Sequence, residues 1–418
     1  MVIADDGALR DLDSLTVTLA GSLTATGDPF DPYRLLDPSG EPVAAVAAYL
    51  RDLSACGRPA TTLRSYAMDL LRWHRFLWSV EIPWNQATRV EARDFCLWLQ
   101  VADKPRRPHW RRLGTVPASA SSQQAPAPNA VTGKSAPTVR YAPSTVAHAE
   151  SVLRSFYDFH LEAGTGPMVN PFPLTRTHKT RRHRSPMEAP SFERTGRYRP
   201  RTPARPPRQI PDERFAELFA ALSSNRDRAL VALWISTGAR ASELLGLTCG
   251  DVDPGEQLVT VVRKGTRALQ RLPASPDAFV WLRLYQAQMH ALVPAGRDDP
   301  LFWTLRRPFR QLGYDAARAM FNRANAALGA NWTLHDLRHS AAYRMARDPE
   351  VALTDVQWVL GHARLSTTQI YLNPLEDDVI ASVLAYHARR AEGAAERPAA
   401  SPAYRAESLA VLFARPTP

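Results

Sequence analysis

The fold of this chain is decided by four short stretches, which read TGARASEL at residues 237–244, RKGTR at 263–267, HDLRH at 335–339 and LGHARLSTTQIY at 360–371. Taken one at a time they are ordinary, since arginine is common on surfaces, histidine often caps helices and tyrosine fills cores. Their order and spacing along the chain carry the information.

Around these motifs, residues 210–390 are expected to form one domain. A helix is expected over 211–222, and a buried helix over 227–237 that the following glycine ends. The β-rich runs 258–262 and 268–272 flank RKGTR and predict an antiparallel hairpin. Helical patterns fill most of the remainder, so the domain is expected to be mostly helical with a small antiparallel β-sheet.

Residues 41–173 are expected to form a smaller, all-helical domain. The stretch 60–80 places its apolar residues largely on one helix face, and TRVE at 88–91 is typical of a capping box that begins the next helix. Residues 101–142, rich in Pro, Ala, Ser and Gln, predict a flexible insertion. Residues 1–40 are polar, acidic and rich in turns, and predict a loose N-terminal arm.

The net charge of +11 favours a polyanionic partner. This charge is concentrated, because residues 174–208 hold eleven Arg or Lys against two Glu, and the rest of the chain carries only +2. An Arg/Pro-rich basic linker is therefore expected over 174–209. It is either a solvated, disordered segment or a strap along a phosphate backbone, and composition alone does not favour binding.

Composition also argues against several classes of protein. No run of eighteen apolar residues occurs, and the acidic start lacks the pattern of a secretory signal, so no membrane partner is expected. Cys56, Cys96 and Cys249 are odd in number and widely spaced, which favours buried thiols in a reducing cytoplasm over disulfides or a zinc site. Neither a G-x-x-x-x-G-K-[ST] motif nor a dominant carboxylate cluster is present, so no cofactor and no metal is expected.

In their order and spacing, the four stretches resemble the signature of the tyrosine recombinases, the phage integrase family. That signature is an Arg in T-G-x-R-x-S-E-L, a Lys in a β-hairpin, H-x-x-R, and L-G-H with a Tyr nine residues on. The resemblance covers about residues 210–385, and the helices of 42–165 resemble the family's SAM-like core-binding domain. It implies a mainly α (α+β) fold and a catalytic domain over 210–390. The implied catalytic residues are Arg240, Lys264, His335, Arg338, His362 and Tyr371.

The same side chains suit phosphoryl transfer on chemical grounds. Arg240 and Arg338 offer planar, permanently charged forks that match the non-bridging oxygens of a phosphodiester. His335 and His362 are expected to donate hydrogen bonds to the phosphate or to transfer protons. Tyr371 is the expected nucleophile, because a covalent phosphotyrosine keeps the bond energy and divides strand exchange into two transfers.

Lys264 is expected to be the general acid for the leaving 5′ oxygen. The chain has 48 Arg and only four Lys, so a lysine at this point of the hairpin is notable. Lysine can release a proton, whereas arginine effectively cannot. The alternative is a solvent-facing hairpin lysine. Glu243 lies one helical turn after Arg240 and either braces its guanidinium or forms a structural salt bridge, and it receives no catalytic role.

The resemblance implies a site-specific DNA recombinase or integrase that cuts and rejoins strands through a 3′-phosphotyrosine, without metal or ATP. One alternative is a type IB topoisomerase-like enzyme, and another is a DNA-binding relative without activity. The L-G-H-to-Tyr spacing and the helical domain favour a recombinase, and all six residues of the signature are present. Dimer resolvase, transposon integrase and phage integrase all remain open as subclasses.

The implied partners are double-stranded DNA and further copies of the chain, which would form a tetramer on DNA, with any accessory protein or partner recombinase open. The tail over 391–418 ends in an apolar stretch that is expected either to dock on a neighbouring protomer or to pack on its own domain. Arg64 and Arg72 are candidates for reading bases. A cytoplasmic, nucleoid-associated location in a bacterium, phage or mobile element is expected.

Overall fold

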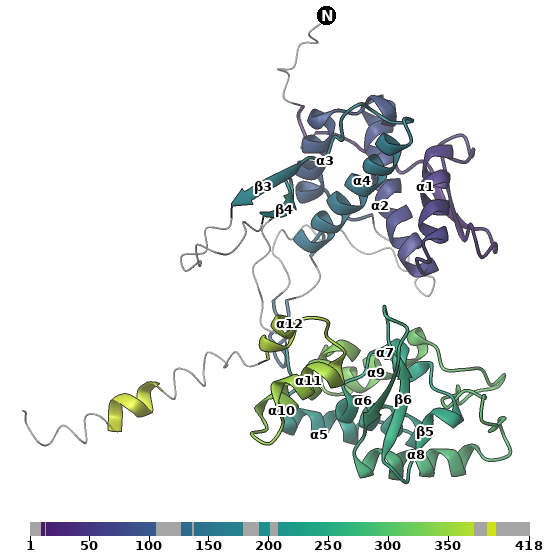
Figure 1. Ribbon diagram of the computed structural model, residues 1–418, viewed down its shortest axis with the longest axis vertical. Coiled ribbons are helices and arrows are strands. Elements are labelled where there is room, and N and C mark those ends of the chain that lie inside the picture. The colour runs from purple at the N-terminus through teal and green to yellow at the C-terminus, as the bar shows by residue number, and fades with distance from the viewer. Residues whose placement is uncertain are drawn as a thin grey trace, which may run out of the picture. The chain divides into compact units, whose positions relative to one another are not determined.

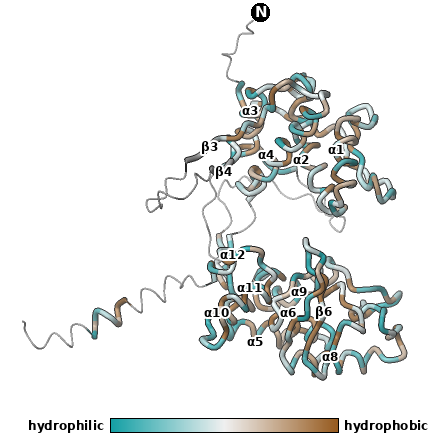
Figure 2. The backbone as a smooth tube through the Cα atoms, viewed as in Figure 1, coloured by the Kyte–Doolittle hydropathy of each residue, from teal (hydrophilic) through white to brown (hydrophobic). Residues whose placement is uncertain are grey.

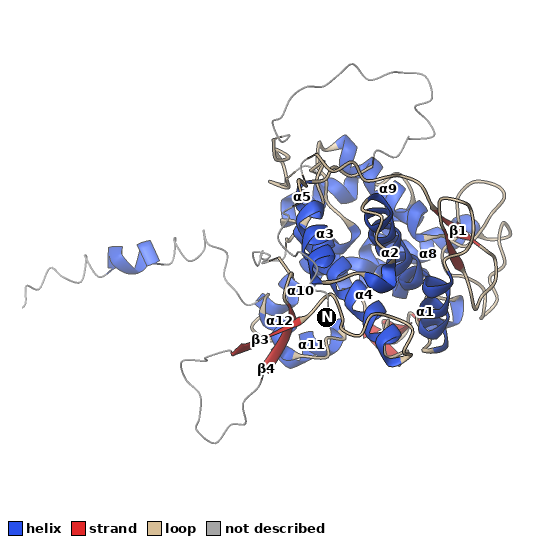
Figure 3. Cartoon of the chain, turned by 90° about the horizontal axis from the view of Figure 1, so that it is seen from above, coloured by secondary structure: helices blue, strands red, loops and turns tan. Residues whose placement is uncertain are grey.

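The computed structural model describes most of the chain, in two compact units. The described residues are 10–12, 14–105, 127–135, 138–178, 192–200, 208–371 and 383–389. The first unit comprises residues 1–127 and 135–204, and the second comprises 128–134 and 205–418. Helices predominate and the strands form only small antiparallel sheets (Figure 1, Figure 3), which confirms the mainly α (α+β) fold class.

The described part of the first unit is built on helices around an aromatic core. These helices are α1 (Ala44–Ala55), α2 (Ala60–Ser79), α3 (Arg89–Val101) and α4 (Pro143–Glu162). Trp73 is fully buried, and its indole N–H donates to the hydroxyl of Tyr157 over 2.9 Å. The predicted capping box at the start of α3 is confirmed, since the carboxylate of Glu91 accepts the backbone N–H of Thr88 over 2.8 Å.

Residues 1–40 were expected to form a loose arm, but their described part is folded onto the first unit. Strands β1 (Ser22–Ala25) and β2 (Tyr33–Leu36) pair antiparallel, and Leu35 is buried in the core of the first unit. Arg75 on α2 donates hydrogen bonds to three backbone carbonyls of this segment. The strands are only four residues long, so their pairing depends on these tertiary contacts and not on a visible sequence pattern.

The basic segment 174–209 is also more than an extended linker. Its described ends form strands β3 (Leu174–His178) and β4 (Phe192–Gly196), which pair antiparallel. Both stretches lack proline, which permits a ladder of backbone hydrogen bonds. The partners are far apart in sequence, and composition therefore could not reveal the pairing.

The insertion at 101–142 has defined contacts where it is described, which differs from the flexible segment expected. Its two ends are joined by an isolated antiparallel bridge. Residues 128–134 belong to the second unit, where the side-chain amide of Asn129 donates to the carbonyl of Gly329 over 2.8 Å. This polar contact joins two loops, and loop-to-loop contacts leave no periodic signal in a sequence.

In the second unit, helices surround a three-stranded antiparallel sheet. The strands are β5 (Val252–Asp253), β6 (Leu258–Val262) and β7 (Leu269–Pro273), paired in the order β5-β6-β7. The helices are α5 (Asp212–Ala220), α6 (Asn225–Thr237), α7 (Ala241–Leu245), α8 (Pro276–Met289), α9 (Tyr314–Ala327), α10 (Leu334–Arg347), α11 (Leu353–Leu360) and α12 (Leu365–Gln369).

Helix α6 lies at the centre of this unit. It packs against α8 and α10, and its apolar residues from Ala229 to Trp234 are buried. Figure 2 colours each residue by hydropathy, from hydrophilic teal to hydrophobic brown. On β6 and β7, Val259 and Leu272 face each other and are completely buried, so the hairpin has one face in the core. The expected hairpin and central helix are therefore present, and they hold the four motifs on one folded unit.

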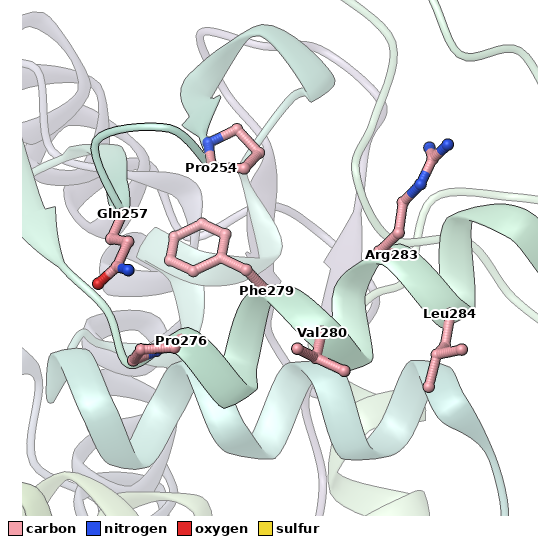
Figure 4. A pocket seen from close by; sticks show the side chains of 7 residues that line it. All are labelled: Pro254, Gln257, Pro276, Phe279, Val280, Arg283 and Leu284. Atoms are coloured by element: carbon pink, nitrogen blue, oxygen red, sulfur yellow. The ribbon is translucent and has the colours of Figure 1, made fainter.

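Two further features of the described residues bear on function. None of the helices among them is long and apolar enough to cross a membrane. A shallow groove on α8 is lined by apolar side chains, among them Phe279, Val280 and Leu284 (Figure 4). The groove contains none of the six predicted site residues, so it is separate from the candidate site.

Candidate active site

Helix α10 places three of the relevant side chains on one face. Its start is fixed by a capping box in which Asp336 accepts the backbone N–H of Thr333 over 2.7 Å. His335, Arg338 and His339 follow at spacings of three and four residues, which brings them to the same side of the helix. The cap fixes the residue at which α10 begins and therefore sets the position of these three side chains.

Arg338 is the buried centre of the site, with a relative exposure of 3%. One terminal nitrogen donates to the carbonyl of Gly238 over 2.6 Å, and the other donates to the carbonyl of Leu360 over 2.7 Å. Gly238 adopts a left-handed conformation, and a Cβ there would lie 2.9 Å from the Leu360 side chain. Glycine is thus required where α6 ends, and Arg338 ties that end to the end of α11.

Burial lowers the pKa of Arg338 to about 10, and the nearby charge of Arg240 acts in the same direction. The guanidinium therefore stays charged at neutral pH. Its energetic cost of burial is offset by hydrogen bonds to the two helix-end carbonyls, which carry partial negative charge. Arg338 is therefore a fixed positive charge held by the C-terminal ends of α6 and α11.

His362 is held in one tautomer. A nitrogen of Arg338 lies 3.2 Å from its Nε2, and because a guanidinium only donates, Nε2 accepts. Nδ1 then carries the proton and donates to the hydroxyl of Thr368 over 2.9 Å. Burial and the charges of Arg338 and Arg240 lower the pKa of His362 to about 4, so the ring is neutral near pH 7.

Tyr371 lies inside the same cluster, with a relative exposure of 3%. Its hydroxyl is 2.8 Å from Nδ1 of His339, and its ring lies parallel to that of His362 with the centroids 6.3 Å apart. Burial raises the pKa of the phenol, while the charge of Arg338 opposes this effect. The hydroxyl is therefore protonated near neutral pH, and it is in hydrogen-bonding contact with an imidazole nitrogen.

His339 was not among the predicted site residues. Burial lowers its pKa to about 4, with a further contribution from His335, whose ring centroid is 4.3 Å away. His335 is exposed to solvent on one side, but the protein packed against the ring partly desolvates it, and this effect together with the charge of Arg338 lowers its pKa as well. The position of His339 four residues after His335 in HDLRH was a signal in the sequence, but which histidine reaches Tyr371 depends on the tertiary fold.

Glu243 connects Arg240 and the hairpin to each other. One carboxylate oxygen accepts the backbone N–H of Arg240 over 2.8 Å, and the other accepts its guanidinium over 3.0 Å and the backbone N–H of Lys264 over 3.1 Å. Burial opposes ionisation of Glu243, but the donors of Arg240 and Lys264 outweigh it and the pKa is lowered. Arg240 remains partly exposed, with 30% of its side chain accessible.

Lys264 has an anchored backbone and an exposed side chain. Among the described residues its ammonium has no hydrogen-bond partner, so it is free to meet a ligand. The neighbouring Arg263, which was not predicted either, is buried and donates to Glu243 over 3.0 Å. The hairpin thus presents one cation outward and retains the other inside.

The structure places the six predicted residues in the second unit, with different degrees of contact. Arg338 touches His362, and Tyr371 packs beside His362. Arg240 is linked to this group by its effect on the pKa of His362. Among the described residues no group of three or more His, Cys, Asp or Glu is arranged to hold a metal ion. The cluster combines a buried phenol with permanent cations and neutral imidazoles.

Two family models match the chain. The model of the phage integrase family matches residues 209–377, and that of the phage integrase N-terminal SAM-like domain matches residues 46–117. The chain belongs to the phage integrase family of tyrosine recombinases. The matched ranges contain all six predicted site residues, helices α2 and α3, and α1 except for its first two residues.

Curated relatives of the chain include tyrosine recombinases of the Xer type. XerD of Neisseria meningitidis is 32% identical over 173 residues, covering 40% of this chain and 58% of the relative. XerC of Serratia marcescens is 36% identical over 148 residues, covering 35% and 47%. The chain spans about half the length of the curated relatives it matches.

Solved structures with the same fold come from several recombinases. A lambda integrase dimer bound to a COC′ core site has a TM-score of 0.52 at 15% identity, covering 78% of this chain and 76% of that one. The Tn1549 transposon integrase with circular intermediate DNA has a TM-score of 0.52 at 13% identity, covering 81% and 98%. XerH in a post-cleavage complex with palindromic difH has a TM-score of 0.54 at 15% identity, covering 82% of this chain and 85% of that one. At these identities the likeness concerns the fold.

Proposed function

We propose that this protein is a site-specific DNA recombinase that cuts and rejoins DNA strands through a 3′-phosphotyrosine on Tyr371. The observation that carries the proposal is the hydrogen bond between the hydroxyl of Tyr371 and His339, in a cluster that also holds the buried Arg338. A nucleophile beside a base and a fixed cation are the parts that phosphoryl transfer requires.

Arg240 and Arg338 bind the scissile phosphate in this mechanism. Arg338 uses three of its five N–H groups for Gly238, Leu360 and His362, and the others are available for a non-bridging oxygen. Arg240 is partly exposed and already oriented by Glu243. Because both guanidinium groups are held before DNA arrives, little reorganisation accompanies charge development in the transition state.

Proton transfer begins at Tyr371. The neutral ring of His339 accepts the phenolic proton at Nδ1 as the Tyr371 oxygen forms its bond to phosphorus. The bond from phosphorus to the 5′ oxygen breaks, and Lys264 donates a proton to that oxygen. Attack by a 5′ hydroxyl then reverses these steps, releases Tyr371 and rejoins a strand, so neither ATP nor a metal ion is consumed.

In this scheme His335 and His362 donate hydrogen bonds to the phosphate, whereas His339 acts on the phenol of Tyr371. In the absence of DNA, burial and the charges of the nearby arginines lower the pKa of His362 and keep its ring neutral. A bound phosphodiester adds a negative charge, which offsets those arginines and favours a protonated ring that donates to a phosphate oxygen. His335, which is exposed beside His339, is placed to do the same.

The proposed partners are double-stranded DNA and further copies of this chain, assembled as a tetramer. The net charge of +11 and the basic segment 174–209 support a DNA partner, and structural neighbours were solved as DNA complexes, one of them a dimer. We assign core binding to residues 41–173 and catalysis to 210–390. The tail at 391–418, proposed to dock on a neighbouring protomer, lies outside the described residues.

The subclass within the family stays broad in this proposal. Curated relatives are Xer recombinases, whereas structural neighbours include a phage and a transposon integrase. A dimer resolvase, a transposon integrase and a phage integrase all use the chemistry described above. A cytoplasmic, nucleoid-associated location follows from a DNA substrate and is part of the proposal.

Covalent trapping tests the proposed function. The protein is incubated with a library of nicked duplexes in the presence of a chelator, denatured, and assayed for a DNA–protein adduct. We expect an adduct with the native chain and none with Tyr371→Phe. DNA binding without an adduct would indicate a catalytically silent relative, and relaxation of supercoiled plasmid without joining of two duplexes would favour a topoisomerase-like enzyme. An adduct that persists in Tyr371→Phe would overturn the assignment.

A further inference from the structure

Arg263 is a buried arginine directly before the proposed general acid. Only 4% of the residue is exposed, although it lies next to an exposed hairpin tip. Its Nε donates to the side-chain oxygen of Gln270 over 2.6 Å, and one terminal nitrogen donates to Glu243 over 3.0 Å. The other terminal nitrogen donates to the carbonyl of Val359. One guanidinium therefore contacts β7, α7 and α11.

Residues of the hairpin and of the end of α11 both shape the contact between Arg263 and α11. Gln270 also donates to a carbonyl at the end of this helix, that of Trp358, over 2.7 Å. In the next turn Gly361 has a left-handed conformation, and a Cβ there would lie 3.1 Å from Nε and 3.2 Å from Cζ of Arg263. The glycine of the L-G-H motif thus leaves room for the guanidinium of Arg263.

We propose that Arg263 is a positioning residue that holds the β6–β7 hairpin against the end of α11 and thereby sets the place of Lys264. The inference rests on the proposed function, in which Lys264 protonates the leaving oxygen. The backbone of Lys264 is attached to Glu243, and Glu243 is in turn bonded to Arg263. Since the tip itself is exposed, these buried contacts are the restraint on where the ammonium of Lys264 can reach.

An arginine suits this task better than a lysine. The three acceptors lie in different directions, and the planar fork has donors on Nε and both terminal nitrogens, whereas an ammonium is a single point charge. An error of about 1 Å in the position of a reacting group costs about a hundredfold in rate. A misplaced Lys264 should therefore slow leaving-group departure without removing the phosphate clamp.

A change of leaving group isolates this role. In a 5′-bridging phosphorothiolate duplex, sulfur replaces the bridging 5′ oxygen, and a thiolate leaves without a proton from Lys264. We expect the substitution Arg263→Met to slow cleavage of ordinary DNA by about a hundredfold. The same variant should cleave the sulfur substrate within about tenfold of the native rate, and Lys264→Ala should behave in the same way. Arg263→Lys should not restore cleavage of ordinary DNA.

Two further variants keep the test decisive. Gln270→Leu removes an acceptor of Arg263 while keeping its charge, so it should show a smaller defect with the same sulfur rescue even if Arg263→Met folds poorly. Arg283→Met, on the exposed face of α8 (Figure 4), controls for the lost charge and should cleave both substrates normally. An equal defect on both substrates in Arg263→Met and Gln270→Leu would overturn the inference. Failure of the native chain on both substrates would instead contradict the proposed function.

Discussion

Replacing Glu243 with glutamine should destabilise the second unit strongly. Four N–H groups point at this buried carboxylate, two from Arg240, one from Arg263 and one from the backbone of Lys264, at 2.8 to 3.1 Å. A glutamine keeps one accepting oxygen and turns an NH₂ group toward the remaining donors. It also leaves Arg263 buried without its counter-charge.

The size of the effect follows from these contacts. Two lost hydrogen bonds to a charged acceptor correspond to about 1.5–3 kcal/mol each, and breaking a buried ion pair from one side costs about 3–5 kcal/mol. The two estimates describe the same loss, so the free energy of unfolding should fall by about 3–5 kcal/mol. Catalysis should fail as well, because Arg240 and Lys264 lose their anchor.

Hydrogen exchange measures this change within the intact chain. Buried amides of α6 exchange mainly by unfolding of the second unit, and those of α2 serve as an internal reference in the first. Exchange along α6 should accelerate by about two to four powers of ten, since a factor of ten corresponds to about 1.4 kcal/mol. Glu217→Gln, which disrupts the exposed pair with Arg214, should leave exchange unchanged. A loss below about 1 kcal/mol in Glu243→Gln, the range of an exposed pair, would refute the reasoning.

Three further changes have defined outcomes. His339→Phe removes the partner of the Tyr371 hydroxyl, so single-turnover cleavage should slow by about a hundredfold, and an unchanged rate would exclude His339 as the proton acceptor. Arg338→Lys has a single nitrogen where the guanidinium uses two terminal nitrogens for the carbonyls of Gly238 and Leu360, so it cannot keep this geometry and also clamp a phosphate, and cleavage should fall by about 10²–10³. A gel-shift assay should show nearly native DNA affinity, and equal losses of cleavage and affinity would contradict a transition-state role. Burial lowers the pKa of His74 to about 4, so as the pH falls the unfolded chain takes up a proton near pH 6.5, before the folded chain does. The stability of the first unit should therefore fall between pH 6.5 and 4. In His74→Phe the denaturation midpoint should depend less on pH, and a pH dependence identical to that of the native chain would contradict this.

Much of this architecture could be predicted because it is encoded locally. Helical periodicity, the capping box at Thr88 and the glycine that ends α6 are each visible within a few residues of sequence. The pairing of β1 with β2 and of β3 with β4 was missed for the opposite reason. Those strands are short, and they are stabilised by partners that periodicity and composition do not identify.

The candidate site divides in the same way. The six predicted residues could be chosen because motif order and spacing mark them. His339 and Arg263 stand inside the same motifs, yet their contacts with Tyr371 and with the end of α11 join segments that are far apart in sequence. Which histidine reaches the phenol, and which arginine is buried, is determined by the tertiary packing of these segments.

The most direct test of the central claim is to locate the covalent bond to DNA. The trapped adduct is digested with nuclease and trypsin, and the modified peptide is sequenced by tandem mass spectrometry. Trypsin releases residues 365–389 as one peptide with two tyrosines, Tyr371 and Tyr386, so fragment ions are needed to distinguish them. The account predicts a 3′-linked phosphonucleotide on Tyr371. A nucleotide on Tyr386 or on any other residue, or a 5′ linkage, would contradict it.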